Sequence, residues 1–303
     1  MCGIVGYIGS KNPVEIIMNG LHRLEYRGYD SAGVAVVNEK GLECVKSVGK
    51  LKVLDEKLAQ TPLRGNLGIG HTRWATHGVP SEVNSHPHFN MDKTIAVVHN
   101  GIIENYFELR EALQAEGVVF RSQTDTEVIA HLISKYYQGD LFAAVKRALQ
   151  DCHGAYAIGV ICAHHPDLLV AARHGSPLIV GLGDDEGFIG SDVPAIMKYT
   201  RKVMYIDNGQ VCAITREGVR VEDVYGNPVE VPVSTVEWDD AAAEKEGYPH
   251  FMLKEIHQQA AVLRNTLAGR VEEGSDSVRL TDMNISIDEL KACQKIFIVA
   301  CGT

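Results

Sequence analysis

Several features of membrane, secreted and nucleic-acid-binding proteins are missing from this sequence. No apolar stretch within the 303 residues approaches the roughly 18 residues that a membrane-spanning helix needs. Lys and Arg form no cluster, and the formal charge of −10 disfavours nucleic acid as a partner. The start of the chain lacks the basic and apolar segments of a signal peptide. We therefore expect a cytoplasmic protein that binds neither a membrane nor nucleic acid.

Cysteine is scarce and irregularly spaced. The seven cysteines lie at positions 2, 44, 152, 162, 212, 293 and 301, an odd number without a repeating interval. This spacing predicts reduced thiols rather than a disulfide framework. The histidine pairs at 86/88 and 164/165 lack suitably spaced cysteine or carboxylate partners, so they do not indicate a metal site. We expect neither a metal nor another cofactor.

Short runs rich in β-branched residues alternate with a few amphipathic helices before Pro232. Several runs are apolar at consecutive positions, so both faces of these strands should be covered. Helices are predicted after Pro13, after Asn105, after Thr124 with Glu127 as a capping box, and over Leu141–Gln150. The predicted strands are Gly3–Ile8, Ala32–Asn38, Leu67–His71, Thr94–His99, Ala155–Cys162, Leu168–Ala172, Leu178–Val180, Val203–Ile206, Val211–Thr215 and Val219–Asp223.

The composition changes after Pro232. The acidic, alanine-rich stretch Trp238–His250 is typical of an interdomain linker, and a helix is predicted over Gln258–Gly269. Lys295–Thr303 has the pattern of a buried parallel strand that opens an α/β domain. A lone strand cannot form a domain, so we expect a fragment with a first domain over 2–237, a linker and lead-in over 238–294, and a truncated domain over 295–303.

Cys2 directly follows the initiator methionine. A side chain this small allows removal of Met1, which leaves a thiol and a free α-amine on one residue. The thiolate is the nucleophilic form of cysteine, and an amine with a pKa of about 7.7–8.0 can take the thiol's proton near neutral pH. One residue can then supply both nucleophile and base. The alternative is a small hydrophobe buried at the start of a strand.

Two polar segments follow predicted strands. His71–Gly78 carries Arg73, whose guanidinium can bind a carboxylate, and Trp74, a candidate lid residue; the alternative is a surface loop with Trp74 packed beneath it. The pair Asn100-Gly101 is first of all a turn signal. It also places a side-chain amide beside an unobstructed backbone N–H, and these are the donors that an oxyanion requires.

Two further charged residues allow two interpretations each. Arg27 lies in the polar, glycine-containing link Leu24–Gly33, where a surface turn is favoured over a carboxylate fork. Asp125 lies in the first turn of a predicted helix, where the helix dipole stabilises a carboxylate. The same carboxylate could hold a substrate ammonium group.

Taken together and in this order, these segments resemble the glutamine amidotransferases of the N-terminal-nucleophile hydrolase type. The motifs are Cys2–Gly6, Thr72–Gly78 and His99–Ile103. Arg23–Gly33 and Gly175–Leu178 are similar to the members of this family that aminate a sugar phosphate. The resemblance covers essentially the whole chain. It implies an α+β fold, a four-layer αββα sandwich of two antiparallel sheets.

The resemblance implies a role for each matching residue. Cys2 would be the nucleophile and its own α-amine the base, with Asn100 and Gly101 as the oxyanion hole. The remaining residues would contact glutamine. Its α-carboxylate would be held by Arg73 and Thr76, and its α-ammonium by Asp125. The loop that closes over the substrate would carry Trp74 and His77, and Arg27 would lie at the edge of the site.

The implied substrate is free L-glutamine, which would be hydrolysed to glutamate and ammonia. Fructose 6-phosphate would accept the ammonia only in a full-length, homodimeric enzyme that also contains a sugar-isomerase half. The segment Cys301–Thr303 is similar to the start of that half, where Thr303 matches a sugar-phosphate contact.

Three rival hypotheses stay open. The chain could be the glutaminase half of an amidotransferase that forms phosphoribosylamine or asparagine, although Arg23–Gly33 and Phe297–Thr303 favour the sugar enzyme. It could be a non-catalytic glutamine-binding or regulatory module on the same fold, which retention of Met1 would support. A self-processing peptidase is disfavoured, because only one residue precedes Cys2.

Overall fold

The computed structural model describes residues 2–75, 77–237, 248, 250–267, 285–295 and 297. The chain divides into two compact units, Met1–Glu244 and Lys245–Thr303. Thr76, Thr303 and most of the predicted linker 238–250 and predicted strand 295–303 lie outside the described residues. Within the described part, no helix combines the length and the apolar character needed to cross a bilayer.

The first unit contains two sheets in which every pair of neighbouring strands is antiparallel. The eight-stranded sheet has the order β14 (Val233–Thr235), β11 (Lys202–Tyr205), β9 (Ile179–Gly183), β10 (Glu186–Gly190), β1 (Gly3–Ile8), β4 (Leu67–Arg73), β2 (Ser31–Asn38) and β3 (Gly41–Val48). The six-stranded sheet has the order β13 (Val219–Asp223), β12 (Gln210–Ile214), β8 (His165–His174), β7 (Gly154–Cys162), β6 (Ile95–Ile103) and β5 (His88–Phe89).

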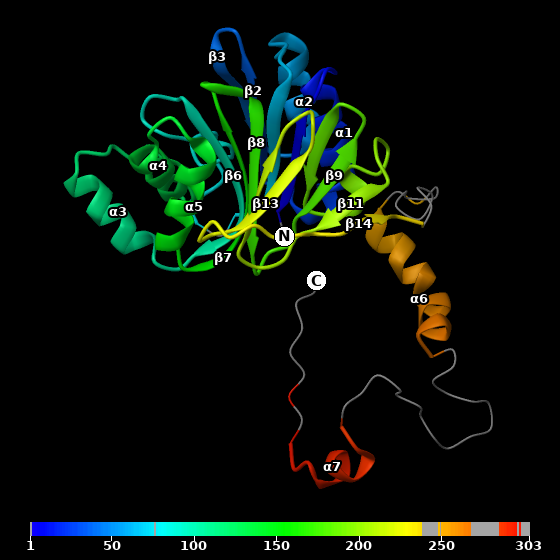
Figure 1. Ribbon diagram of the computed structural model, residues 1–303. Coiled ribbons are helices and arrows are strands. Elements are labelled where there is room, and N and C mark those ends of the chain that lie inside the picture. Colours follow the sequence, from blue (N-terminus) through cyan, green and yellow to red (C-terminus); the bar gives the residue numbers. More distant parts are fainter. Residues whose placement is uncertain are drawn as a thin grey trace. The chain divides into compact units, whose positions relative to one another are not determined.

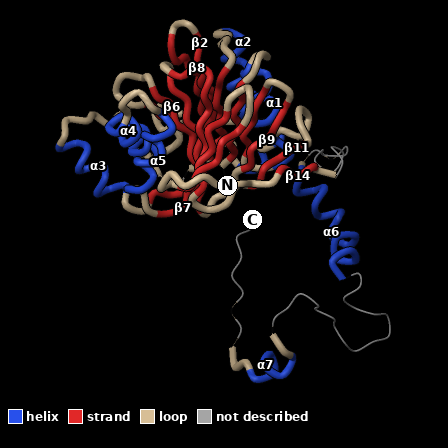
Figure 2. Tube along the Cα trace, in the orientation of Figure 1, coloured by secondary structure: helices blue, strands red, loops and turns tan. Residues whose placement is uncertain are grey.

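Helices cover the outer face of each sheet. Figure 1 shows α1 (Pro13–Arg23) and α2 (Leu51–Gln60) on one side of the strands. The other side carries α3 (Tyr106–Ala115), α4 (Thr126–Tyr136) and α5 (Leu141–Asp151). Figure 2 shows the strands as a block between these two helical layers. The fold is therefore the predicted αββα sandwich.

Three apolar clusters fill the spaces between the four layers. One joins α1 and α2 to the larger sheet, and another joins α3, α4 and α5 to the smaller sheet. The third lies between the sheets and includes Ile4, Ile69, Val98 and Ile161. Both faces of the central strands are thus buried, which explains why β1 is buried at every position and reads as a continuous apolar run.

Two predicted helix starts differ in detail. The capping box at Thr124 and Glu127 is wrong, because α4 begins after Asp125 and the Thr124 hydroxyl lies 3.1 Å from His88 Nε2 instead. Asn105 does precede α3, but its side chain does not cap that helix. Its amide bonds the Asp151 carbonyl and the His153 N–H, each at 2.8 Å, and so ties α3 to the end of α5.

Several elements escaped prediction, namely β3, β5, β10, β14 and α2. The second unit contains α6 (Phe251–Leu267), which begins earlier than the predicted helix, and α7 (Ile287–Ala292), which was not predicted. A capping box between Ser286 and Glu289 opens α7.

Candidate active site

Cys2 lies directly before β1, where the two sheets meet. The Trp74 N–H points at its sulfur, with 3.1 Å between N and Sγ. Its carbonyl oxygen accepts hydrogen bonds from Arg27 Nε at 3.1 Å and from Asn100 Nδ2 at 3.2 Å. Burial raises the pKa of the Cys2 thiol, and the Trp74 N–H partly opposes this effect. The thiol therefore needs a base to react near neutral pH.

Asn100 and Gly101 lie inside β6 rather than in a turn. They are paired with Ala157 and Tyr156 of β7, so the turn interpretation of this Asn-Gly pair is wrong. Gly101 has φ +132°, and a Cβ atom there would lie 2.0 Å from the Ala155 carbonyl oxygen. Only glycine fits this position. The strand thus carries the Asn100 amide directly to Cys2.

Arg73 is the last residue of β4 and is 3% exposed. Its Nη2 donates to the His77 and Gly78 carbonyl oxygens, the second at 2.9 Å, and thereby folds the following loop around the guanidinium. Its Nη1 is buried and has no hydrogen-bond partner among the described residues. A buried cationic donor without a partner is costly, so this atom is available for an anionic ligand.

Asp125 is buried and is the N-cap residue of α4, directly before the first turn in which the sequence predicts it. Its Oδ2 accepts the Ile103 N–H at 2.9 Å, and His77 Nδ1 lies 3.9 Å from its Oδ1. His99 Nδ1 is 4.0 Å from Oδ2, and burial lowers the pKa of His99 and favours its neutral form. Asp125 thus brings a carboxylate to the same region as Arg73 and His77.

Arg27 is buried, contrary to the surface interpretation favoured by the sequence. It lies in a short 3₁₀ helix, Glu25–Arg27, and is only 8% exposed. Besides its bond to the Cys2 carbonyl, its Nη1 lies 3.6 Å from Asp192 Oδ2. Trp74, by contrast, is 46% exposed, and its ring meets that of Tyr29 edge-on at 5.5 Å. Trp74 therefore has the exposure expected of a lid residue.

The structure brings most of the predicted residues together. Direct hydrogen bonds join Cys2 to Arg27, Trp74 and Asn100. Arg73 and Asp125 each contact His77. A hollow beside this second group is lined by Ala75, Gly78, Val79, Pro80 and Gln123.

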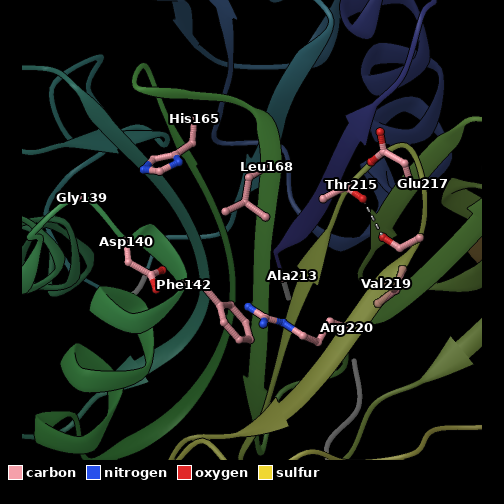
Figure 3. A pocket seen from close by; sticks show the side chains of 11 residues that line it. Gly139, Asp140, Phe142, His165, Leu168, Ala213, Thr215, Glu217, Val219 and Arg220 are labelled. Atoms are coloured by element: carbon pink, nitrogen blue, oxygen red, sulfur yellow. Dashed lines mark hydrogen bonds between the residues drawn. The ribbon is translucent and has the colours of Figure 1, made fainter.

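The segment Gly175–Leu178 contacts the site only indirectly. Gly175 forms an isolated bridge with Tyr156, the β7 partner of Gly101, and its N–H bonds Asn208 Oδ1. Another hollow lies between the start of α5 and strands β8, β12 and β13, and none of the predicted site residues lines it (Figure 3). There, the Arg220 guanidinium covers the Phe142 ring at 4.8 Å.

Three contributors escaped prediction because their role depends on contacts between distant segments. His71 and Ser191 both bond the Asn100 side chain, at 2.9 Å each. Asp30 accepts the Ala75 N–H and so anchors the loop after Arg73. No local spacing in the sequence links these residues to Cys2. The pairing of β1 with β10 and β4, the pairing of β4 with β2, and the packing of the sheets bring them together.

Residues 59–248 match the family model described as glutamine amidotransferase domain. Two curated relatives, both called glutamine–fructose-6-phosphate aminotransferase (isomerizing), come from Thermus thermophilus and Clostridium tetani. Each is 52% identical over the whole chain. The chain spans about half the length of these relatives, 49% and 50% respectively.

A solved structure supports the same comparison. Glutamine phosphoribosylpyrophosphate amidotransferase from B. subtilis, complexed with ADP and GMP, superposes with a TM-score of 0.66 and 27% identity. The match covers 75% of this chain and 50% of that one.

Glu127 of α4 holds the loop that leads to Asp125. It accepts hydrogen bonds from the backbone N–H groups of Arg121 at 2.8 Å and Ser122 at 2.6 Å. Burial alone would raise the pKa of Glu127, but bonds from His131, the Ser122 hydroxyl and these backbone groups outweigh it. The resulting pKa is about 2, below the ordinary value of 4.5. The charged form is thus the one that the fold stabilises.

We predict that Glu127→Gln lowers the free energy of unfolding at neutral pH. Because the folded-state pKa is depressed, the contribution of Glu127 is complete above pH 4.5 and is lost as the pH falls towards about 2. Denaturant titrations at a series of pH values should show the two proteins converging over this interval. The exposed α3 variant Glu111→Gln is the control. A difference that stays constant from pH 7 to pH 2 would contradict this role.

Proposed function

Because the chain belongs to the glutamine amidotransferase domain family, we propose that it hydrolyses the side-chain amide of free L-glutamine with Cys2 as the nucleophile. The observation that best supports this proposal is the meeting of Cys2 and Asn100. They lie 98 residues apart in the sequence, Cys2 directly before β1 of the larger sheet and Asn100 in β6 of the smaller one, yet the Asn100 amide nitrogen is 3.2 Å from the Cys2 carbonyl oxygen. This contact supports a site in which Cys2 would be the nucleophile and Asn100 an oxyanion donor.

The base in this proposal is the α-amine of Cys2 after removal of Met1. Burial raises the pKa of the thiol, so the thiolate is scarce without a base. An α-amine with a pKa of about 7.7–8.0 is unprotonated in a useful fraction near neutral pH. It is attached to the same residue and can take the thiol proton without any side chain from elsewhere.

The reaction then follows the logic of acyl transfer. The Cys2 thiolate attacks the amide carbon of glutamine, and the oxyanion that forms is stabilised by the Asn100 Nδ2–H and the Gly101 N–H. The amine then gives its proton to the departing nitrogen. The C–N bond breaks, ammonia leaves, and a thioester remains between Cys2 and the glutamyl group. Water attacks this thioester, glutamate is released, and the thiol regains its proton.

The charges around the site suit an amino acid with free termini. Arg73 Nη1, which has no hydrogen-bond partner in the part of the chain that the structure describes, would bind the α-carboxylate, assisted by Thr76. The carboxylate of Asp125 would bind the α-ammonium, and Trp74 and His77 belong to the loop that would close over the substrate. Arg27, bonded to the Cys2 carbonyl, would border the reacting atoms.

We further propose that the ammonia serves the amination of fructose 6-phosphate to glucosamine 6-phosphate in a homodimeric full-length enzyme. This finer assignment is supported by 52% identity to two fructose-6-phosphate aminotransferases, against 27% to the phosphoribosylpyrophosphate amidotransferase. The glutaminase domain would span 2–237 and the lead-in 238–294. The segment 295–303, with Thr303 as a sugar-phosphate contact, would begin the isomerase half. The chain alone would then act as a glutaminase.

We predict that Asn100→Ala lowers the kcat of glutamine hydrolysis by a factor on the order of 10²–10³, because one oxyanion donor is lost. The KM should change little, since the amide binds the transition state more than the substrate. Ammonia release under steady-state conditions measures both constants. Asn227→Ala, in the turn after β13, is the control. Unchanged turnover of the Asn100 variant would refute the role of this residue.

We also predict selectivity for free glutamine over glutamine with blocked α-amino and α-carboxyl groups. Hydrogen bonds to charged groups contribute about 1.5–3 kcal/mol each, roughly 10-fold to 150-fold per group. The blocked compound loses both charged partners, those of Arg73 and Asp125. Its kcat/KM should therefore fall by at least the smaller of these factors. Equal rates for the two compounds would mean that the pocket described here does not bind the substrate.

A further inference from the structure

The orientation of the Asn100 side chain follows from an unambiguous acceptor next to it. His71 Nε2 lies 2.9 Å from Asn100 Oδ1 and 3.0 Å from the His99 carbonyl oxygen. A carbonyl oxygen can only accept, so His71 Nε2 must carry the hydrogen. The atom of Asn100 that faces it must then also be an acceptor. The chemistry of the neighbours therefore assigns the amide oxygen to His71 and the amide nitrogen to the Cys2 side.

Ser191 holds the opposite end of the same amide. Its Oγ accepts from Asn100 Nδ2 at 2.9 Å and from Ile4 N at 2.7 Å. The Ser191 N–H donates to the Ile4 carbonyl at 3.0 Å, which fixes Ser191 against β1, two residues from Cys2. His71 and Ser191 are both buried. Residues of the larger sheet and its flanking turn thus bond both the oxygen and the nitrogen of the Asn100 amide, which belongs to the smaller sheet.

The surroundings of His71 keep its ring in a single form. The ring stacks on His86 with centroids 4.0 Å apart and an interplanar angle of 18°. Burial lowers the pKa of His71 to about 3, so the imidazole is neutral at neutral pH. Its Nδ1 has no hydrogen-bond partner in the described chain. The one proton of the neutral ring therefore sits on Nε2, where the two carbonyl-type oxygens require it.

We propose that His71 is a positioning residue for the amidotransferase reaction. It keeps Asn100 Nδ2, and not Oδ1, on the Cys2 side, where the N–H that bonds the Cys2 carbonyl would turn to the oxyanion while the other stays on Ser191. This inference rests on the proposed role of Asn100 as oxyanion donor. Without the His71 N–H, the amide can rotate and present its oxygen to the developing negative charge, which would repel it. Ser191 supports the same orientation from the other end. Both residues act through Asn100 and do not touch the substrate.

Two substitutions of His71 separate this role from packing. His71→Phe keeps an aromatic ring against His86 but removes the N–H, whereas His71→Gln loses the ring and keeps an N–H donor at a similar reach. We expect the kcat of the Phe variant to fall by roughly 10²-fold, the cost of a misplaced catalytic group, with little change in KM. The Gln variant should retain much more activity. If His71 served only to pack against His86, the Phe variant should be more active than the Gln variant.

Alkylation of Cys2 by iodoacetamide gives the second measurement, because this displacement forms no oxyanion. Peptide mapping of the Cys2 adduct should show the same rate in the wild type and in both variants. His88→Phe is the matched control, since His88 is buried edge-on to His86 but hydrogen bonds Thr124 instead of Asn100. Its kcat should be unchanged.

The outcomes are distinct. A Phe variant at least as active as the Gln variant, or parallel loss of hydrolysis and alkylation, would overturn the positioning role. A wild-type chain that alkylates at Cys2 but hydrolyses no glutamine would refute the proposed function itself. If the His71 variants do not fold, Ser191→Ala tests the other end of the amide. It should lower kcat and leave alkylation unchanged, and an unchanged kcat would contradict the inference.

Discussion

The hydrogen bond from the Asn100 side chain to the backbone of Cys2 is the contact on which the candidate site depends. It joins the first residue before β1, in the larger sheet, to the middle of β6, in the smaller one. The apolar layer between the sheets sets the distance between them. The register of β1 against β4 sets where Cys2 lies along β4, and this places it beside Trp74. A shift of one residue in either sheet would turn these side chains to the opposite face.

Burial gives the polar groups of the site their chemical character. It raises the pKa of the Cys2 thiol and lowers that of His71, so both are uncharged near neutral pH without a neighbouring base or acid. Among the described residues, the buried Arg73 Nη1 has no hydrogen-bond partner, while Nη2 bonds the loop after β4. Burial therefore favours the protonated Cys2 thiol and the neutral His71 ring.

The sequence predicts the layers of strands and helices better than the side-chain contacts of the site. Continuous apolar runs indicated strands covered on both faces, and the bounds of β1 and β13 agree with the structure. Local signals were misleading where tertiary contacts compete with them: the Asn100-Gly101 pair lies inside a paired strand, and Thr124 bonds a histidine instead of capping α4. Arg27 is buried because it bonds the Cys2 carbonyl and pairs with Asp192. The hydrogen bonds from His71 and Ser191 to Asn100 leave no local pattern in the sequence, because the three residues come from distant segments.

The most direct test of the account is labelling with a diazoketone analogue of glutamine, followed by mass spectrometry of the intact chain and of its peptides. If Cys2 is the nucleophile, each active chain should carry one adduct, on the thiol of a Cys2 that is the N-terminal residue, and ammonia release should fall in proportion to labelling. Free glutamine should protect the thiol. Labelling of a different cysteine in step with inactivation, or full activity in chains that retain Met1, would contradict it.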